Sequence, residues 1–357
     1  MEQKKIISWG QLLLLLFMCR MFTFMTFVPL IAEGRSLTVQ LIAAAISTAV
    51  QAIILIPIVI LHRGVTEAAI EKNKAAGIFA AVLYLVFFLF YSVNSLLHFQ
   101  NFLSSRFFPT AESSMWIGVL LIVCVYCGCL GIEALGRSAV LLFWLFVVSL
   151  VIMGISSAND FDTANLSFSL RYSKGLFSAV MDDLARNGEI CAAAFLAKHI
   201  ENNFRSRKLR CGIYGLLVSK LAAVSVVSVL IAAVLGDFAS LTDYPFLTVG
   251  TFGGTRFIQR GDSIYLIVWT ITAVINIALF LHIAGGLIGE IFPKIKFRTL
   301  ISAVIVFGIS LFFTLTDRPF SGIYEIICSG YAVILLAGII PLIVLIAQKK
   351  GGKKAGA

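Results

Sequence analysis

Long apolar stretches separated by short polar ones dominate this sequence. Ten of them are long enough to cross a bilayer as a helix, which takes about 20 residues. Their approximate bounds are 9–31, 37–61, 76–97, 114–130, 137–155, 175–200, 211–235, 263–291, 300–315 and 324–347. The pattern predicts an all-α polytopic membrane protein with about ten transmembrane helices, forming one integral membrane domain over residues 1–357.

Composition and charge support this prediction and add an orientation. The chain is 60% hydrophobic and 13% charged, more apolar than a soluble domain of 357 residues could bury. The net charge of +10 does not indicate nucleic acid, because the basic residues sit in loops between apolar stretches. Eighteen of the 28 lysines and arginines fall on one side of the predicted topology and seven on the other. Since cytoplasmic loops are enriched in lysine and arginine, both termini are expected in the cytoplasm.

The sixth stretch is unlike the others. It contains Asp182, Asp183, Arg186 and Glu189, and an Asn187-Gly188 pair interrupts it. Charges at bilayer depth cost several kcal/mol unless they face partners or a cavity, and a glycine inside a helix costs about 1 kcal/mol relative to alanine. The pattern favours two half-helices with a binding site at the break.

Two further basic residues, Arg20 and Lys220, fall inside apolar stretches, and with Arg186 they match in number the three acids of the sixth stretch. Arg20 lies near the middle of the first stretch, as Asn187-Gly188 does in the sixth. A five-plus-five inverted repeat, with halves at about 9–155 and 175–347, would bring these positions together at mid-membrane. We therefore expect helices one and six to be discontinuous.

Two motif-like stretches suggest a family. The first holds Phe107-Phe108-Pro109-Thr110, Trp116 and the run Gly131 to Arg137; the second holds Tyr244-Pro245, the run 257–262 and Trp269. With ten spans and this length, the chain resembles the B subunit of the spore-germination nutrient receptors. These are endospore germination permeases of the amino acid–polyamine–organocation transporter superfamily.

The resemblance implies a ten-helix bundle with a small-molecule pocket between spans one, three, six and eight. It also implies a multi-pass protein in the inner membrane of the endospore, which senses a nutrient such as an amino acid beside A-type and C-type receptor subunits. Two departures matter. The middle of span one, 19–24, holds no glycine, and span five, 137–155, holds no lysine of the kind that replaces sodium in transporting relatives.

The predicted ligand-binding residues come from spans one, three, six and eight. They are Arg20, Thr23, Tyr91, Asn94, Asp182, Asn187, Gly188, Glu189, Thr272 and Asn276. Arg20 either binds a ligand carboxylate bidentately or forms a salt bridge with Asp182 or Glu189. Arg186 is expected to pair with Asp182 and Glu189 on its own helix, with Lys220 a structural partner for one of the acids. The uncharged polar residues either line the pocket or bond a neighbouring helix.

Catalytic, metal and cofactor motifs are not found in the sequence. The four histidines are scattered, and Cys124-x-x-Cys127 lies in an apolar stretch with no histidine or acid nearby. We therefore predict no enzyme, no cofactor and no metal site. The two functions left are a germinant-receptor subunit and, as the alternative, a proton-coupled amino-acid permease. The bulky Arg20 and the missing lysine in span five favour the receptor.

Overall fold

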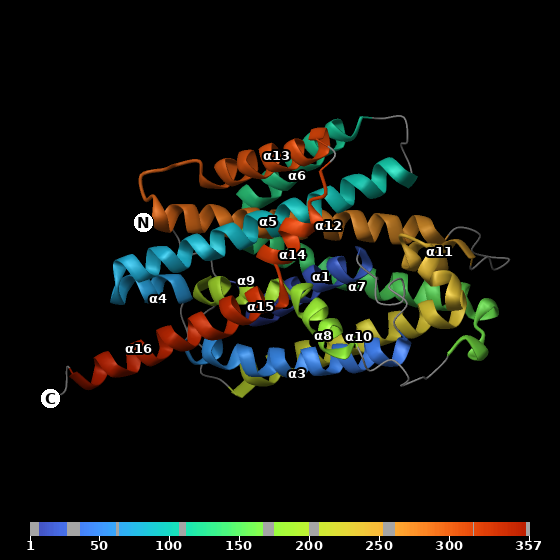
Figure 1. Cartoon of the computed structure of the whole chain (residues 1–357), viewed down its shortest axis with the longest axis horizontal. Helices are drawn as coiled ribbons and strands as arrows, with labels where there is room; N and C mark the ends of the chain where they lie inside the picture. The colour runs from blue at the N-terminus through green and yellow to red at the C-terminus, as the bar shows by residue number, and fades with distance from the viewer. Residues whose placement is uncertain are drawn as a thin grey trace.

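The computed structural model describes residues 7–26, 36–61, 64–106, 112–166, 175–199, 207–252, 261–316 and 318–354, and these form a bundle of helices (Figure 1). The helices that carry the predicted spans are α1 (Trp9–Thr26), α3 (Leu37–Leu61), α5 (Lys74–Arg106), α6 (Ser113–Leu130), α7 (Ile132–Ser156), α8 (Leu176–Ala185) with α9 (Glu189–Leu196), α10 (Arg207–Leu235), α12 (Gly261–Ile291), α13 (Arg298–Thr316), and α14 (Ser321–Ile327) with α15 (Gly330–Val333) and α16 (Ile340–Lys354). Eight of these segments are long and apolar enough to span a membrane; α6 is shorter, and α8–α9 is broken. The predicted all-α polytopic membrane fold is confirmed.

Several predicted boundaries move. Helix α5 continues past Leu97 to Arg106, and α7 begins at Ile132, directly after Gly131 with its φ of 92°. The predicted end of the first span, residues 27–31, lies outside the described residues. So do two of the motif runs, 107–110 and 257–260.

Helix six is discontinuous, as predicted, but helix one is not interrupted where it was expected to be. Helix α1 runs unbroken from Trp9 through Arg20 to Thr26. Its run 19–24 lacks glycine, so the backbone keeps its regular hydrogen bonds there.

The sequence also left some elements undetected. A short helix, α4 (Val65–Lys72), fills the loop after the second span. The tenth span breaks at Cys328 and Ser329. At the break the Ser329 side chain accepts a hydrogen bond from the Ala332 amide. The span then continues through a π-helical segment, Ile334–Ile339. The loop over 237–262 contains a further short helix, α11 (Pro245–Phe252), most of which is buried.

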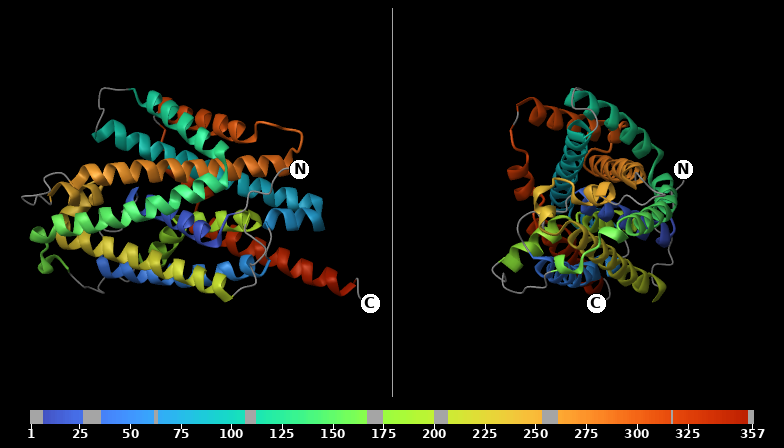
Figure 2. Two further views of the ribbon diagram at one scale, coloured as in Figure 1. Left: turned by 180° about the vertical axis from the view of Figure 1, so that it is seen from behind. Right: turned by 90° about the vertical axis from the view of Figure 1, so that its right-hand side faces the viewer.

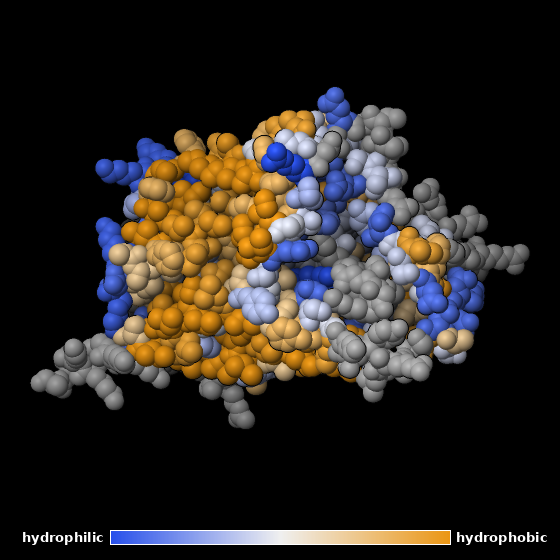
Figure 3. Space-filling model, in the orientation of Figure 1, coloured by the Kyte–Doolittle hydropathy of each residue, from blue (hydrophilic) through white to orange (hydrophobic). Residues whose placement is uncertain are grey.

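Helices α1, α5 and α12 form the centre of the bundle. In their most apolar windows 78%, 56% and 67% of the residues are buried, against 22% in α13 and 28% in α7. The peripheral helices instead expose large apolar side chains, such as Ile122 at 72% and Leu141 at 75%. Figure 3 shows a broad hydrophobic band over the side of the molecule, with hydrophilic residues beyond it at either end. A continuous apolar surface of this kind is suited to lipid.

The two ends of the bundle differ. Ile7 donates its amide hydrogen to the carbonyl of His199 (3.0 Å), Lys72 donates to the carbonyl of Ala347, and Lys198 pairs with Glu67 and Glu290. We call this the N/C end, since the first and last described segments both reach it; Figure 2 shows both from behind and from the side. The described loops that were predicted to be cytoplasmic lie here.

Candidate functional site

The break in helix six has a defined backbone geometry. Helix α8 closes with a short-range bond from the Asn187 amide to the Leu184 carbonyl (3.0 Å), and α9 opens with a bond from the Ile190 amide to the Asn187 carbonyl (3.1 Å). Ile190 would bond the Arg186 carbonyl in a continuous helix. The break therefore frees the Arg186 carbonyl for other donors.

Three side chains from two other helices donate to this carbonyl. They are the Arg20 guanidinium (3.2 Å), the Thr23 hydroxyl (3.2 Å) and the Tyr91 hydroxyl (3.1 Å). Arg20 thus lies at the C-terminal end of α8, where the helix dipole favours a cation. The carbonyl fixes α1 and α5 against the break.

Gly188 is required by the closeness of α5. A Cβ atom at this position would lie 2.3 Å from Cε2 of Tyr91. The Tyr91 ring has little room to move, because it packs against Phe87, Phe280 and Tyr324 with centroid distances of 5.7, 4.9 and 6.1 Å. Only glycine fits between the ring and the backbone of the break.

Two buried ion pairs cross the break. Arg20 Nη2 lies 2.6 Å from Asp183 Oδ1, and Lys220 pairs with Glu189. The four residues, which we call the charged centre, are each at most 4% exposed and carry no net charge together. Glu189 opens α9, where the positive end of the helix dipole favours an acid.

Amides complete the charged centre. Asn187 Nδ2 donates to Asp183 Oδ2 (3.2 Å) and to its carbonyl (2.6 Å), while Lys220 donates to Gln51 Oε1 (3.2 Å). Glu189 Oε2 and Asn187 Oδ1 are buried and make no hydrogen bond within the described chain. The cavity lined by Arg20, Asp183, Asn187 and Lys220 measures about 10 Å³. That is room for about one water molecule, so the site is closed in this conformation.

The structure corrects the predicted pairing of these charges. Arg20 pairs with Asp183, where Asp182 or Glu189 was expected, and Glu189 pairs with Lys220. The predicted role of Lys220 as partner of an acid is confirmed. Asp182 is half-buried on the adjacent face of α8. The helical repeat does not separate the two aspartates, since Asp183 is i,i+4 with Asn187 and Asp182 is i,i+4 with Arg186.

Gln51 was also missed by sequence reasoning. It is 1% exposed, and its amide donates to Ser47 one turn earlier (3.0 Å). Two polar residues at i,i+4 within the apolar second span were the available signal, because such residues face the bundle interior.

Three of the predicted site residues lie away from the charged centre. The Thr272 hydroxyl donates to the Val268 carbonyl of its own helix (2.6 Å), and Asn276 Nδ2 donates to Ser95 on α5 (3.1 Å). Both residues were expected either to line the ligand pocket or to form a hydrogen bond with a neighbouring helix. Asn276 forms such a bond. Asn94 lines a separate pocket at the end opposite the N/C end. The residues gathered at the break are Arg20, Thr23, Tyr91, Asn187, Gly188 and Glu189.

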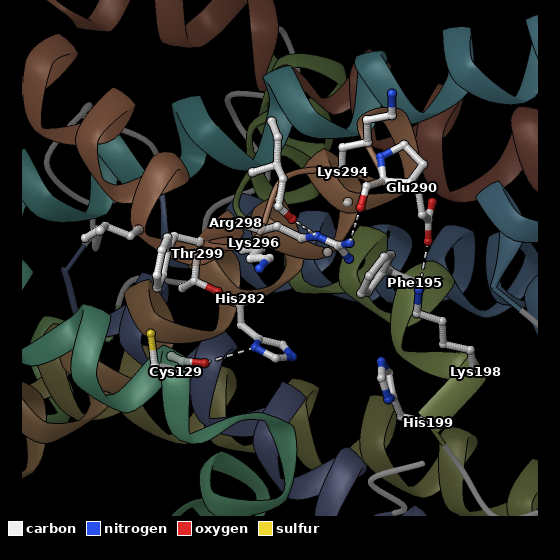
Figure 4. A pocket seen from close by; sticks show the side chains of 18 of the residues that line it. Cys129, Phe195, Lys198, His199, His282, Glu290, Lys294, Lys296, Arg298 and Thr299 are labelled. Atoms are coloured by element: carbon white, nitrogen blue, oxygen red, sulfur yellow. Dashed lines mark hydrogen bonds and ion pairs between the residues drawn. The ribbon is translucent and has the colours of Figure 1, made fainter. Parts of the chain in front are cut away.

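A cavity of about 1030 Å³ lies at the N/C end. Side chains of α9, α12 and the segment that leads into α13 face one another across it (Figure 4). Lys198 pairs there with Glu290 (2.8 Å), and Arg298 donates to the carbonyls of Pro293 and Ile295 (3.0 and 2.8 Å). Much of its charge therefore stabilises the cavity wall.

Comparison with solved structures shows which known fold this chain shares. Two mutants of the manganese transporter of Eremococcus coleocola match 97% of this chain and 77% of their own, with TM-scores of 0.57 and 0.56 at 9% and 10% identity. The same transporter in complex with an aromatic bis-isothiourea substituted compound matches 96% and 76%, with a TM-score of 0.56 at 10% identity. The protein therefore has the fold of the amino acid–polyamine–organocation transporters, a class of multi-pass membrane proteins.

The family follows from the sequence profile. The profile described as "Spore germination protein" matches residues 7–321, and the chain belongs to this spore permease family. No curated protein matches. Within the residues that the structure describes, no group of three or more His, Cys, Asp or Glu side chains is placed to hold a metal ion.

Proposed function

We propose that this protein is the membrane subunit of a spore germinant receptor, which binds a small nutrient and signals with A-type and C-type subunits. Family membership supports a role in germination, and the transporter fold supports a small-molecule site inside the bundle. We further propose that the protein lies in the inner membrane of the endospore with both termini in the cytoplasm, because the basic loops gather on that side of the predicted topology.

The pairing of opposite charges across the break supports an amino acid as the nutrient. Arg20 and Asp183 are buried, 2.6 Å apart, and balance each other. Removing one partner of a buried pair leaves an uncompensated charge, which costs about 3–5 kcal/mol. A zwitterion avoids this cost, since its carboxylate replaces Asp183 at Arg20 while its ammonium replaces Arg20 at Asp183.

Binding of such a ligand requires the site to open. The cavity of about 10 Å³ cannot hold an amino acid, so Arg20 and Asp183 must separate, and α8 must move relative to α1. A ligand shifts a conformational equilibrium only by its difference in affinity for the two states. Exchange of the ion pair provides that difference and links occupancy to the position of α8.

Binding of amino acids to the purified protein tests this proposal. A panel of L-amino acids is screened for thermal stabilisation, and the strongest is measured by equilibrium binding. We expect the double variant Arg20→Met/Asp183→Asn to remain folded and to lose binding at least about tenfold, or 1.4 kcal/mol. The control neutralises an exposed pair, Arg137→Gln/Glu133→Gln, and should bind normally. Unchanged binding in the first double variant would exclude this site.

The cavity at the N/C end favours one alternative, a proton-coupled amino-acid permease. Alternating access requires a route from the central site to one side of the membrane, and a cavity of about 1030 Å³ at one end would provide part of it. Reconstituted protein without partner subunits distinguishes the two functions. The receptor proposal predicts binding without accumulation; uptake driven by an imposed proton gradient would support the permease instead.

A further inference from the structure

A second pocket lies at the end of the bundle opposite the N/C end. It measures about 430 Å³, within the range of about 300–1,000 Å³ of ligand pockets, and is lined by α5, by the C-terminal end of α13 and by the start of α14. Phe313, Phe320 and Leu97 form apolar parts of its wall, and Asn94, Gln100 and Arg318 supply polar groups.

One polar group of this pocket is buried without a hydrogen-bond partner. Asn94 is 3% exposed, and its amide nitrogen is buried without a hydrogen bond. The Gln100 side chain, also 3% exposed, lines the same pocket. An unpaired buried donor costs about 1–3 kcal/mol, which a bound acceptor would recover.

The charge of the pocket selects an anion. Arg318 is exposed and forms no ion pair with any residue that the structure describes. The lining contains no acidic side chain among these residues. A guanidinium binds a carboxylate through two parallel hydrogen bonds, and the hydroxyls of Thr314 and Ser321 add further donors. The aromatic wall suits a short apolar body.

We propose that this pocket binds a small carboxylate with an apolar body, held by Arg318 at its carboxylate and by the amides of Asn94 and Gln100. The site is distinct from the charged centre and is formed by different helices. Binding of a carboxylate here does not depend on the proposed receptor function. If the protein is a receptor, this pocket would give the carboxylate of a nutrient a first binding position outside the closed centre.

Ring contacts join this pocket to the break. The Phe320 ring lies 6.1 Å from that of Tyr324, which lies 6.1 Å from that of Tyr91, and Tyr91 donates to the Arg186 carbonyl. In addition, α15, which follows α14, crosses α8 so closely that a Cβ at Gly330 would lie 2.4 Å from the Met181 carbonyl oxygen. A ligand that shifts α14 therefore acts on packed groups that contact α8.

Simple carboxylates test this site separately from the charged centre. Isovalerate and phenylacetate carry no ammonium group, so they cannot replace the Arg20–Asp183 pair without leaving a net charge. We expect saturable binding of at least one of them to the purified full-length protein, weakened about tenfold or more by Arg318→Gln and partly retained in Arg318→Lys. Asn94→Leu should also weaken binding.

The controls separate the two sites. Arg137→Gln, a matched exposed arginine, and Arg20→Met/Asp183→Asn should both bind the carboxylates normally, and isobutylamine should not compete. Failure of both carboxylates to bind the wild-type protein, or binding that survives Arg318→Gln, would overturn this proposal while leaving the amino-acid test of the charged centre intact.

Discussion

At the scale of single residues, one backbone carbonyl and two ion pairs organise the site. The Arg186 carbonyl accepts hydrogen bonds from Arg20, Thr23 and Tyr91, so the break in one helix fixes two others. The sequence identified the right residue types on these helices. It could not choose Asp183 over Asp182, because that choice depends on which face of α8 turns toward α1.

Arg20→Met should destabilise the protein by about 3–5 kcal/mol, because Asp183 is left charged and buried. The matched double variant Arg20→Met/Asp183→Asn removes both charges and should recover most of this loss. Reversible unfolding of the detergent-solubilised protein, followed by titration with a denaturing detergent, measures both. Equal stability of the single variant and the wild-type protein would show that the pair is not buried as described.

Lys220→Met should destabilise by a similar mechanism, since Glu189 loses its partner and its second oxygen already lacks a hydrogen bond. Here Lys220→Met/Glu189→Gln is the charge-matched control. If the single and the double variants unfold alike, the two residues are not coupled, and the closed centre contains one ion pair instead of two.

At the scale of elements, two spans are broken, and α15, which follows the second break, packs on α8, which precedes the first. Helix six breaks at Asn187 and Gly188, and span ten breaks at Cys328 and Ser329. The first break was predictable from its charges and from glycine. The second carries no charge, and its signal, a serine followed by a glycine in an apolar stretch, also occurs in unbroken membrane helices.

Gly188→Ala should destabilise the protein by about 1–3 kcal/mol through overpacking, because the added methyl would meet the Tyr91 ring at 2.3 Å. Gly154→Ala in α7 is the matched control, since nothing lies within 4 Å of a Cβ there, and its melting temperature should be unchanged or slightly raised. A melting temperature for Gly188→Ala equal to that of this control would contradict the close packing of α5 on the break.

At the scale of the whole molecule, a hydrophobic band encloses a centre that holds four compensated charges. The peripheral helices α7 and α13 face outward with apolar side chains, and α1, α5 and α12 fill the interior. The division into repeats at about 9–155 and 175–347 stays a prediction, as does the cytoplasmic position of the N/C end.

A fluorescent protein fused to the C-terminus tests this orientation, because it folds into its fluorescent form in the cytoplasm and not after export through the general secretory route. We expect fluorescence of the C-terminal fusion in intact cells, and none when the chain is truncated after residue 320 and fused there. The reverse result would invert the bundle, and would place the pocket of Arg318 on the cytoplasmic side.

The sequence by itself determined the membrane class, the ten spans, the break in helix six and the family resemblance. These follow from hydropathy and local backbone preference, which act over neighbouring residues and need no knowledge of the fold. Only the tertiary structure decided which charges pair, that the Arg186 carbonyl holds three donors, and that Asn94 faces an outer pocket. Arg20 and Asp183, which form an ion pair, and Asn94 and Arg318, which line one pocket, are far apart in the chain. Their placement depends on how whole helices rotate and pack against one another.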